Sequence, residues 1–326
     1  MRHIVIAGIS LALLAVLCAS PSLLGDRVRN ALDGLDAARP AWLWAAALSF
    51  AVAAACGAFA WRAAIRACGT SLPAGSAAAR YCVGSGVNAV APAHLGSAVR
   101  LALFGRVTRG GCWTVGGAAA AVGVARVVWL GVMIALGSAG GLLPAWPLLV
   151  VGAVVVVSGV AAVASSRVRL PAKAEQLLSA FQALSRSPRD FALVAGWTLA
   201  GAGAKVGAAA AVVTALGVDR PLSAALLIVP AVALAAVMPV TPGNVGIASA
   251  AVAFVLAADG VPHTLALSIG IAFGGIEWLT TVGVGLGGLL ALADPLVRPY
   301  LRFAAAATAY GGVAWAFGLT VVLPAV

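Results

Sequence analysis

Four charged residues within apolar runs are the first candidates for chemistry in this sequence. Arg126, Lys205 and Glu277 each lie near the middle of a long apolar run, and Arg100 follows an interruption in another. A charge placed at membrane depth is costly, so such residues are functional by default.

The positions of Arg126 and Glu277 predict an ion pair. They lie 30 and 31 residues, respectively, after a glycine in two similarly interrupted stretches, so they occupy equivalent places and could face each other. Arg100 and Lys205 would then remain as uncompensated positive charge, which suits an anionic ligand. The alternative is that Lys205 extends to the polar interface, or that all four charges only lock helices together.

Two apolar stretches, 76–105 and 222–258, are interrupted near their middles by proline, glycine and asparagine. Proline removes a backbone donor and glycine loosens a helical turn, so backbone groups are freed there and must face protein, water or a polar ligand. A half-helix after each interruption would offer amides and a positive dipole to an anion such as phosphate, whereas a simple hinge or packing kink would bind nothing. Together with the four charges, the candidate substrate-binding residues are Asn88, Pro92, Gly96, Arg100, Arg126, Lys205, Thr241, Pro242, Gly243, Asn244, Gly246 and Glu277.

The elements that must position these residues are overwhelmingly apolar. Hydrophobic residues make up 63% of the 326, charged residues only 9%, and the mean hydropathy is +1.09. No soluble domain of this length could cover that much apolar surface. Every backbone polar group in hydrocarbon needs an internal partner, and long apolar runs favour helices over the alternating strands of a barrel. The sequence therefore predicts an all-α polytopic membrane protein.

Seven apolar runs are long enough to cross a membrane, at about 20 residues each. They lie at 4–24, 41–61, 112–137, 146–165, 191–216, 264–292 and 303–325. The first could instead be a cleaved signal peptide, although an uncleaved span is the favoured interpretation. The two interrupted stretches are predicted to be re-entrant segments.

The order of the segments predicts an inverted repeat within a single membrane domain, 1–326. A first span and external loop (1–40) precede a first repeat (41–165), a linker (166–190) and a second, inverted repeat (191–326). Paired interrupted segments in two inverted halves are typical of transporters with a site near the midplane. The linker has apolar residues at helical spacing among basic ones, so it is either an amphipathic helix on the cytoplasmic leaflet or a solvated connection.

Lys and Arg residues are distributed unevenly between the two sides. One side of the predicted topology receives Arg2, Arg62, Arg66, Arg106, Arg109, Arg167, Arg169, Lys173, Arg186, Arg189, Arg298 and Arg302. The other side receives Arg27, Arg29, Arg39 and Arg220. The positive-inside rule then predicts a bacterial inner-membrane protein with a cytoplasmic N-terminus. The net charge of +11 is explained by these loops rather than by a nucleic-acid partner.

No pattern of an enzyme or a metal site is apparent in the sequence. The five cysteines show no CxxC spacing, His94 and His263 stand alone, and the remaining carboxylates fall in loops or at helix ends without paired spacing. Walker, GxSxG and HExxH motifs are also missing. We therefore expect no enzymatic activity and no cofactor.

The chain resembles the transmembrane region of lysylphosphatidylglycerol synthases, a bacterial family whose members also occur as stand-alone membrane proteins. The resemblance covers nearly the whole length and is most specific in the run from Pro239 to Gly246. It implies a lipid-translocating membrane region, which in the full-length synthases is followed by a cytosolic aminoacyl-transferase domain. Because the chain stops at Val326, that domain is expected to be absent. The matching residues are Trp61, Arg62, Gly69, Asn88, Pro92, Gly96, Arg100, Arg126, Pro239, Thr241, Pro242, Gly243, Gly246, Asp259, Gly260 and Val261.

The chain departs from the family pattern mostly at acidic positions. Ser97, Ala125 and Ser249 stand where family members tend to carry an acid, His94 stands in place of a common basic residue, and Asn244 in place of a glycine. The loss of acids leaves the interior more positive, so a cationic aminoacylated lipid is a poor candidate substrate. The resemblance then favours an anionic phospholipid or a polyprenyl-phosphate-linked lipid.

The expected function is translocation of a lipid between leaflets, as a flippase-like or scramblase-like transporter. One alternative is a non-transporting accessory subunit that binds a lipid-modifying enzyme or glycosyltransferase through the 166–190 segment. Another is a membrane transferase, which is weaker because Glu277 is the only candidate acid in the interior. The sequence names neither the lipid nor the oligomeric state.

Overall fold

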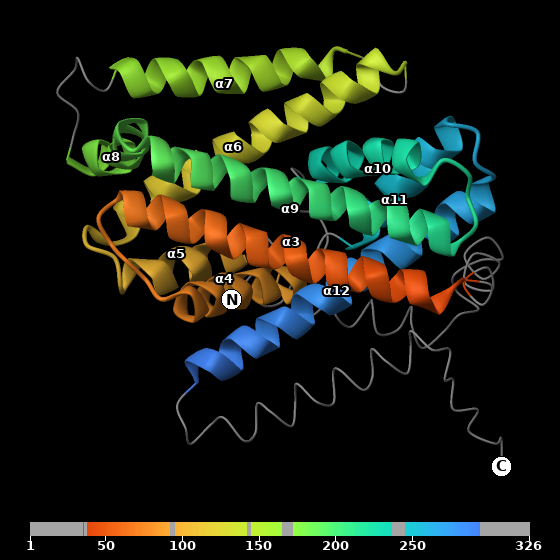
Figure 1. The fold of residues 1–326 in the computed structure, drawn as a ribbon, viewed down its shortest axis with the longest axis horizontal. Helices are drawn as coiled ribbons and strands as arrows, with labels where there is room; N and C mark the ends of the chain where they lie inside the picture. Colours follow the sequence, from red (N-terminus) through yellow and green to blue (C-terminus); the bar gives the residue numbers. More distant parts are fainter. Residues whose placement is uncertain are drawn as a thin grey trace, which may run out of the picture.

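A computed structural model describes residues 35, 38–91, 95–141, 145–164, 172–236 and 245–293 (Figure 1). This part of the chain contains ten helices and no strand, which confirms the all-α prediction. The helices are α3 (Pro40–Ala67), α4 (Ala74–Val90), α5 (Leu95–Gly105), α6 (Gly111–Ala139), α7 (Pro147–Ala164), α8 (Ala172–Arg186), α9 (Pro188–Ala215), α10 (Pro221–Ala235), α11 (Val245–Ala258) and α12 (His263–Leu292).

Four helices are long and apolar enough to cross a membrane. These are α3, α6, α9 and α12, and they coincide with four of the seven predicted spans. Helix α7 lies in the predicted span 146–165 but has only 18 residues. The predicted spans 4–24 and 303–325 lie outside the described residues. The protein is therefore a multi-pass membrane protein, while the count of seven crossings stays a prediction.

Each interrupted stretch contains two short helices. Helices α4 and α5 flank the first interruption, and α10 and α11 flank the second. The two helix pairs lie toward opposite ends of the bundle (Figure 1). The interruptions themselves, 92–94 and 237–244, lie outside the described residues, so the re-entrant path also stays a prediction.

Helices α3 and α9 form an antiparallel pair through the middle of the bundle (Figure 1). At one end the Arg39 amide donates to the Ala215 carbonyl at 3.0 Å. At the other end Arg66 forms an ion pair with Asp190. The pair joins the two predicted repeats, because α3 belongs to the first and α9 to the second.

Two hydrophobic clusters pack along this pair. One joins the first half of α3 and the second half of α9 to α10, α11 and α12, around Phe50 and Phe273. The other joins the opposite halves of α3 and α9 to α4, α5, α6 and α8, around Trp61 and Phe104. Helices α4 and α5 are thus anchored at one end of the α3–α9 pair, and α10 and α11 at the other.

Helix α8 packs onto the bundle within the predicted linker. The Leu184 side chain is buried in the second cluster, and Phe181 packs against it. Helix α9 already begins at Pro188, so the last residues of the predicted linker belong to a membrane-length helix. The apolar face of α8 is therefore covered by protein in the described structure.

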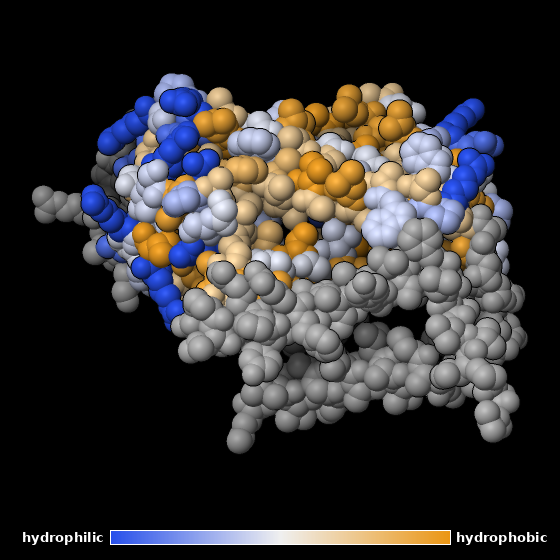
Figure 2. Space-filling view, turned by 60° about the horizontal axis from the view of Figure 1, so that its bottom comes forward, coloured by the Kyte–Doolittle hydropathy of each residue, from blue (hydrophilic) through white to orange (hydrophobic). Residues whose placement is uncertain are grey.

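Hydrophilic side chains gather at the two ends of the molecule, and apolar side chains cover the middle (Figure 2). The ends differ in charge. The end formed by the last turns of α3 and the start of α9 carries Arg62, Arg66, Arg80, Arg106, Arg109, Arg186 and Arg189, whereas the opposite end carries Arg39 and Arg220. This is the asymmetry on which the predicted orientation rests.

Glycines bring α12 of the second predicted repeat against α4 of the first. A Cβ atom at Gly86 would lie 2.8 Å from the Gly285 Cα atom, and one at Gly288 would lie 2.6 Å from the Ala79 carbonyl oxygen. Because lipid tails are as apolar as leucine, close backbone packing is a main source of helix association in membranes.

We expect Gly285→Val to destabilise the bundle, because the new side chain must push α4 away from α12. Overpacking of this kind costs about 1–3 kcal/mol. The measurement is the thermal unfolding midpoint of the detergent-solubilised protein. Gly283→Val is the matched control, since a Cβ atom at Gly283 meets nothing within 4 Å. Equal midpoints for the two variants would contradict the proposed packing.

Candidate functional site

A cavity of about 400 Å³ lies between α3, α4, α6, α9, α10 and α12. Both predicted repeats line it, and its wall is largely apolar. The side chains with a polar group that line it are Tyr81, Ser85, Arg126, Trp129, Trp197, Thr198, Lys205, Glu277 and Thr281, although the Trp129 indole N–H already donates to the Ala195 carbonyl. Three of the four charged residues predicted as binding residues therefore share one cavity.

Glu277 pairs with Lys205 and not with Arg126. The Lys205 Nζ atom donates to the Glu277 Oε1 atom at 3.3 Å, linking α9 to α12. The predicted Arg126–Glu277 pair is therefore wrong, although both residues line the same cavity. Exposed fractions of 48% for the Lys205 side chain and 27% for that of Glu277 show that the cavity is open.

Arg126 reaches a neutral partner from the first repeat. Its Nη2 atom donates to the Tyr81 hydroxyl oxygen at 3.0 Å, which links α6 to α4. Among the described residues, no carboxylate forms an ion pair with Arg126. Its charge is therefore uncompensated within the described structure.

Arg100 lies behind the same tyrosine, outside the cavity wall. It is only 8% exposed, and its guanidinium carbon lies 4.3 Å from the Tyr81 ring centroid and 5.4 Å from that of Trp61. Its Nη2 atom donates to the Ser85 hydroxyl at 2.9 Å. In the described part of the chain its buried Nε atom has no hydrogen-bond partner. The uncompensated pair of charges is thus Arg100 and Arg126, rather than Arg100 and Lys205.

Tyr81 and Ser85 were not among the predicted residues. They are four positions apart on α4, so their side chains lie on the same face of the helix. Two hydroxyl-bearing residues at this spacing in an apolar helix are a signal that can be read from the sequence. Gly57 on α3 makes room for Tyr81, because a Cβ atom there would overlap the phenolic oxygen. No feature of the sequence near Gly57 indicates this role.

Residues on either side of the first interruption hold α4 and α5 together. The Ser97 amide donates to the Asn88 Oδ1 atom at 3.2 Å, so Asn88 satisfies one of the unpaired amides at the start of α5. A Cβ atom at Gly96 would overlap the Gly84 carbonyl, so only glycine permits this crossing. Neither Asn88 nor Gly96 lines the cavity.

The second interruption contributes no described residue to the cavity wall. Gly246 lies in α11 and is not among the lining residues. Thr241, Pro242, Gly243 and Asn244 lie outside the described residues, as does Pro92 of the first interruption. Within the described ranges, no group of histidine, cysteine, aspartate and glutamate side chains could hold a metal ion.

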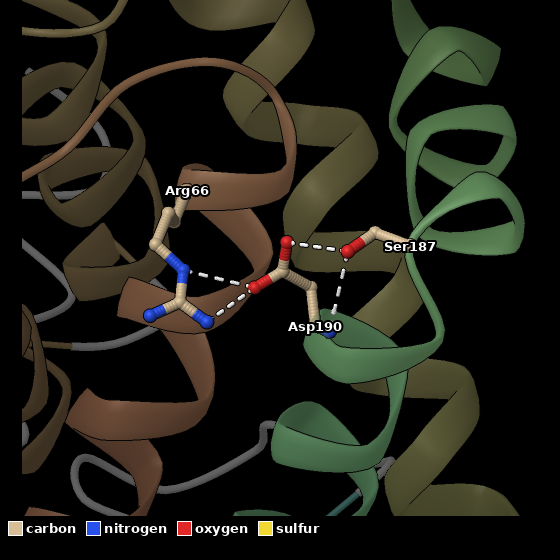
Figure 3. A network of polar contacts seen from close by, with 3 residues as sticks. All are labelled: Arg66, Ser187 and Asp190. Carbon is tan, nitrogen blue, oxygen red and sulfur yellow. Dashed lines mark hydrogen bonds and ion pairs between the residues drawn. The ribbon is translucent and has the colours of Figure 1, made fainter.

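A polar network joins the predicted repeats at the arginine-rich end (Figure 3). The Arg66 guanidinium donates twice to the Asp190 Oδ1 atom, once from Nε at 2.9 Å. The Ser187 hydroxyl donates to the other carboxylate oxygen at 2.8 Å and caps α9 by accepting from the Asp190 amide. The network fixes the end of α3 to the start of α9, so it holds two walls of the cavity in place.

A family model named for the lysylphosphatidylglycerol synthase TM region matches residues 5–285. The chain belongs to this family. The matched range includes every residue that lines the cavity. Membership in the family makes the chain a membrane protein of lipid metabolism or transport. No curated protein matches the chain in sequence.

We expect the Lys205–Glu277 contact to be revealed by a charge swap. Lys205→Glu and Glu277→Lys each place like charges together and should lower the unfolding midpoint, whereas the double variant should recover most of the loss. A double-mutant cycle should give a coupling energy of about 0.5–1 kcal/mol, since the pair is partly exposed.

The matched control is the swap of Arg126→Glu with Glu277→Arg, which should show no recovery because these residues form no ion pair. Recovery in the Arg126 swap alone would support the originally predicted pair and contradict the described contact.

Proposed function

We propose that this protein moves an anionic lipid between the two leaflets by passing its headgroup through the cavity. The observation that carries the proposal is a cavity shared by both predicted repeats, with Arg126 in its wall and no carboxylate paired with that arginine in the described structure. Family membership supports a role with lipids. The acyl chains would stay in the surrounding bilayer.

An anionic headgroup would neutralise the positive charge of Arg126 in the cavity wall. Uncompensated charges at membrane depth are expensive and normally face a partner or a water-filled space. Glu277 already neutralises Lys205. A phosphate in the cavity would supply the missing partner for Arg126, and the Tyr81 and Thr281 hydroxyls would give it neutral hydrogen-bonding groups.

The arrangement of helices offers a route to alternating access. Helices of both predicted repeats line the cavity, and α3 and α9 are fixed to each other at both ends. The movement that we propose is therefore that of the helices packed on the α3–α9 pair, a variant of the rocking of inverted halves around a central site. We further propose that the arginine-rich end faces the cytoplasm of a bacterial inner membrane, in keeping with the positive-inside rule.

The ion pair between Glu277 and Lys205 favours transport over transferase chemistry. Glu277 is the only acid among the described residues that line the cavity, and its carboxylate is engaged by Lys205. A lipid-phosphate transferase needs a free base or nucleophile at the site. We therefore propose that the protein is not an enzyme.

The test is leaflet exchange of fluorescent anionic and zwitterionic phospholipids in liposomes that contain the purified protein. Arg126→Gln should slow exchange of the anionic lipid about tenfold, equivalent to about 1.4 kcal/mol of lost binding in the rate-limiting state. Arg106→Gln is the matched control, because Arg106 is exposed in the α5–α6 loop. Its exchange rate should stay within about twofold of the unmodified protein.

Two outcomes would contradict the proposal. Exchange that is equally fast in the unmodified protein and in Arg126→Gln would exclude passage through this cavity. The absence of any exchange above protein-free liposomes would favour the accessory-subunit alternative, in which α8 matters and the cavity does not.

A further inference from the structure

Two guanidinium groups contact one phenol in the wall of the cavity. Arg126 donates to the hydroxyl of Tyr81, and Arg100 lies over the face of its ring. Arg100 is buried, and among the described residues its guanidinium donates to Ser85, which also lines the cavity. Both positive charges therefore act on the same side of the cavity.

The described structure supplies no counter-charge for this pair. Its two ion pairs are Arg66–Asp190 at the arginine-rich end and Lys205–Glu277 across the cavity. Two uncompensated charges therefore remain beside Tyr81. Arg100 is buried, whereas Arg126 is exposed where it lines the cavity. The two like charges repel each other, and an anion in the cavity would relieve this repulsion.

The two uncompensated arginines indicate how much negative charge the ligand should carry. A phosphodiester headgroup carries one negative charge and would leave one guanidinium uncompensated. A phosphate monoester carries close to two negative charges at neutral pH and has three strong acceptor oxygens. A single monoester group therefore balances both arginines, whereas a single phosphodiester does not.

Resting on the proposed function, we infer that the cavity selects a lipid whose headgroup is a dianionic phosphate monoester. Phosphatidic acid and polyprenyl monophosphates have this chemistry. Arg126 and the Tyr81 hydroxyl would contact the phosphate. Arg100, which is outside the cavity wall, would act as a positioning residue that supplies the second charge and holds Tyr81 in place.

The geometry of Tyr81 suits a donor to phosphate. Its oxygen accepts from Arg126, and in the described part of the chain its hydroxyl donates to no acceptor. Gly57 leaves the space that the phenolic oxygen occupies. A methyl group at position 57 would displace the hydroxyl without changing any charge.

The experiment compares leaflet exchange of fluorescent phosphatidic acid and phosphatidylglycerol with identical acyl chains, in liposomes at pH 8. We expect phosphatidic acid to exchange at least about fivefold faster. Arg100→Gln should bring the ratio of the two rates close to one, because the second charge is lost. Loss of folding alone would slow both lipids together and leave their ratio unchanged.

A pair of glycine variants tests the position of Tyr81. Gly57→Ala should lower the ratio of the two rates, because its Cβ atom displaces the hydroxyl. Gly203→Ala on α9 is the control, since a Cβ atom there meets nothing within 4 Å, and Gly203 does not line the cavity. Its ratio should match that of the unmodified protein.

Failure of this inference is distinguishable from failure of the proposed function. Equal exchange of both lipids, lost in Arg126→Gln, would overturn the preference for a monoester and leave lipid transport intact. No exchange of either lipid would overturn both.

The source of the phosphate is tested by the fluorescence of Trp129 and Trp197, which line the cavity. A change on titration of the detergent-solubilised protein with short-chain phosphatidic acid supports the lipid. A change with inorganic phosphate alone would overturn the lipid assignment in favour of a free anion.

Discussion

The antiparallel contact between α3 and α9 is the constraint on which the other features of the structure depend. It is fixed at one end by the Arg39–Ala215 backbone hydrogen bond and at the other by the Arg66–Asp190 ion pair. Helices α4 and α5 pack on one end of this pair, and α10 and α11 pack on the other, so the two predicted repeats have opposite orientations. The cavity forms where α4, α6, α10 and α12 meet the middle of the pair.

One ion pair lines the cavity, and two arginines beside it have no anionic partner among the described residues. Lys205 and Glu277 neutralise each other across α9 and α12, and both line the cavity. Arg100 and Arg126 instead share Tyr81, a group that can orient them but cannot neutralise them. Arg100 is buried without an anionic partner among the described residues, which costs stability, whereas Arg126 is exposed where it lines the cavity. This arrangement supports the proposed anionic ligand.

Composition and hydropathy were sufficient to predict the helical class and the four long spans, because apolar length is directly readable from sequence. Arg126, Lys205 and Glu277 could be predicted as neighbours for the same reason, since charges in apolar runs are rare and costly. The pairing could not be predicted, because spacing along a helix gives depth in the membrane but not which neighbour lies beside each face. Gly57 and Tyr81 were missed because their roles arise only where two helices meet. The interruptions at 92–94 and 237–244 lie outside the described residues.

Whether the charges around Tyr81 hold an anionic lipid can be measured by native mass spectrometry of the protein extracted from its membrane in mild detergent. We expect acidic lipids to be retained by the unmodified protein and by Arg106→Gln, and to be lost in Arg126→Gln. Retention of the same acidic lipids by Arg126→Gln, or retention of zwitterionic lipids only, would contradict this expectation.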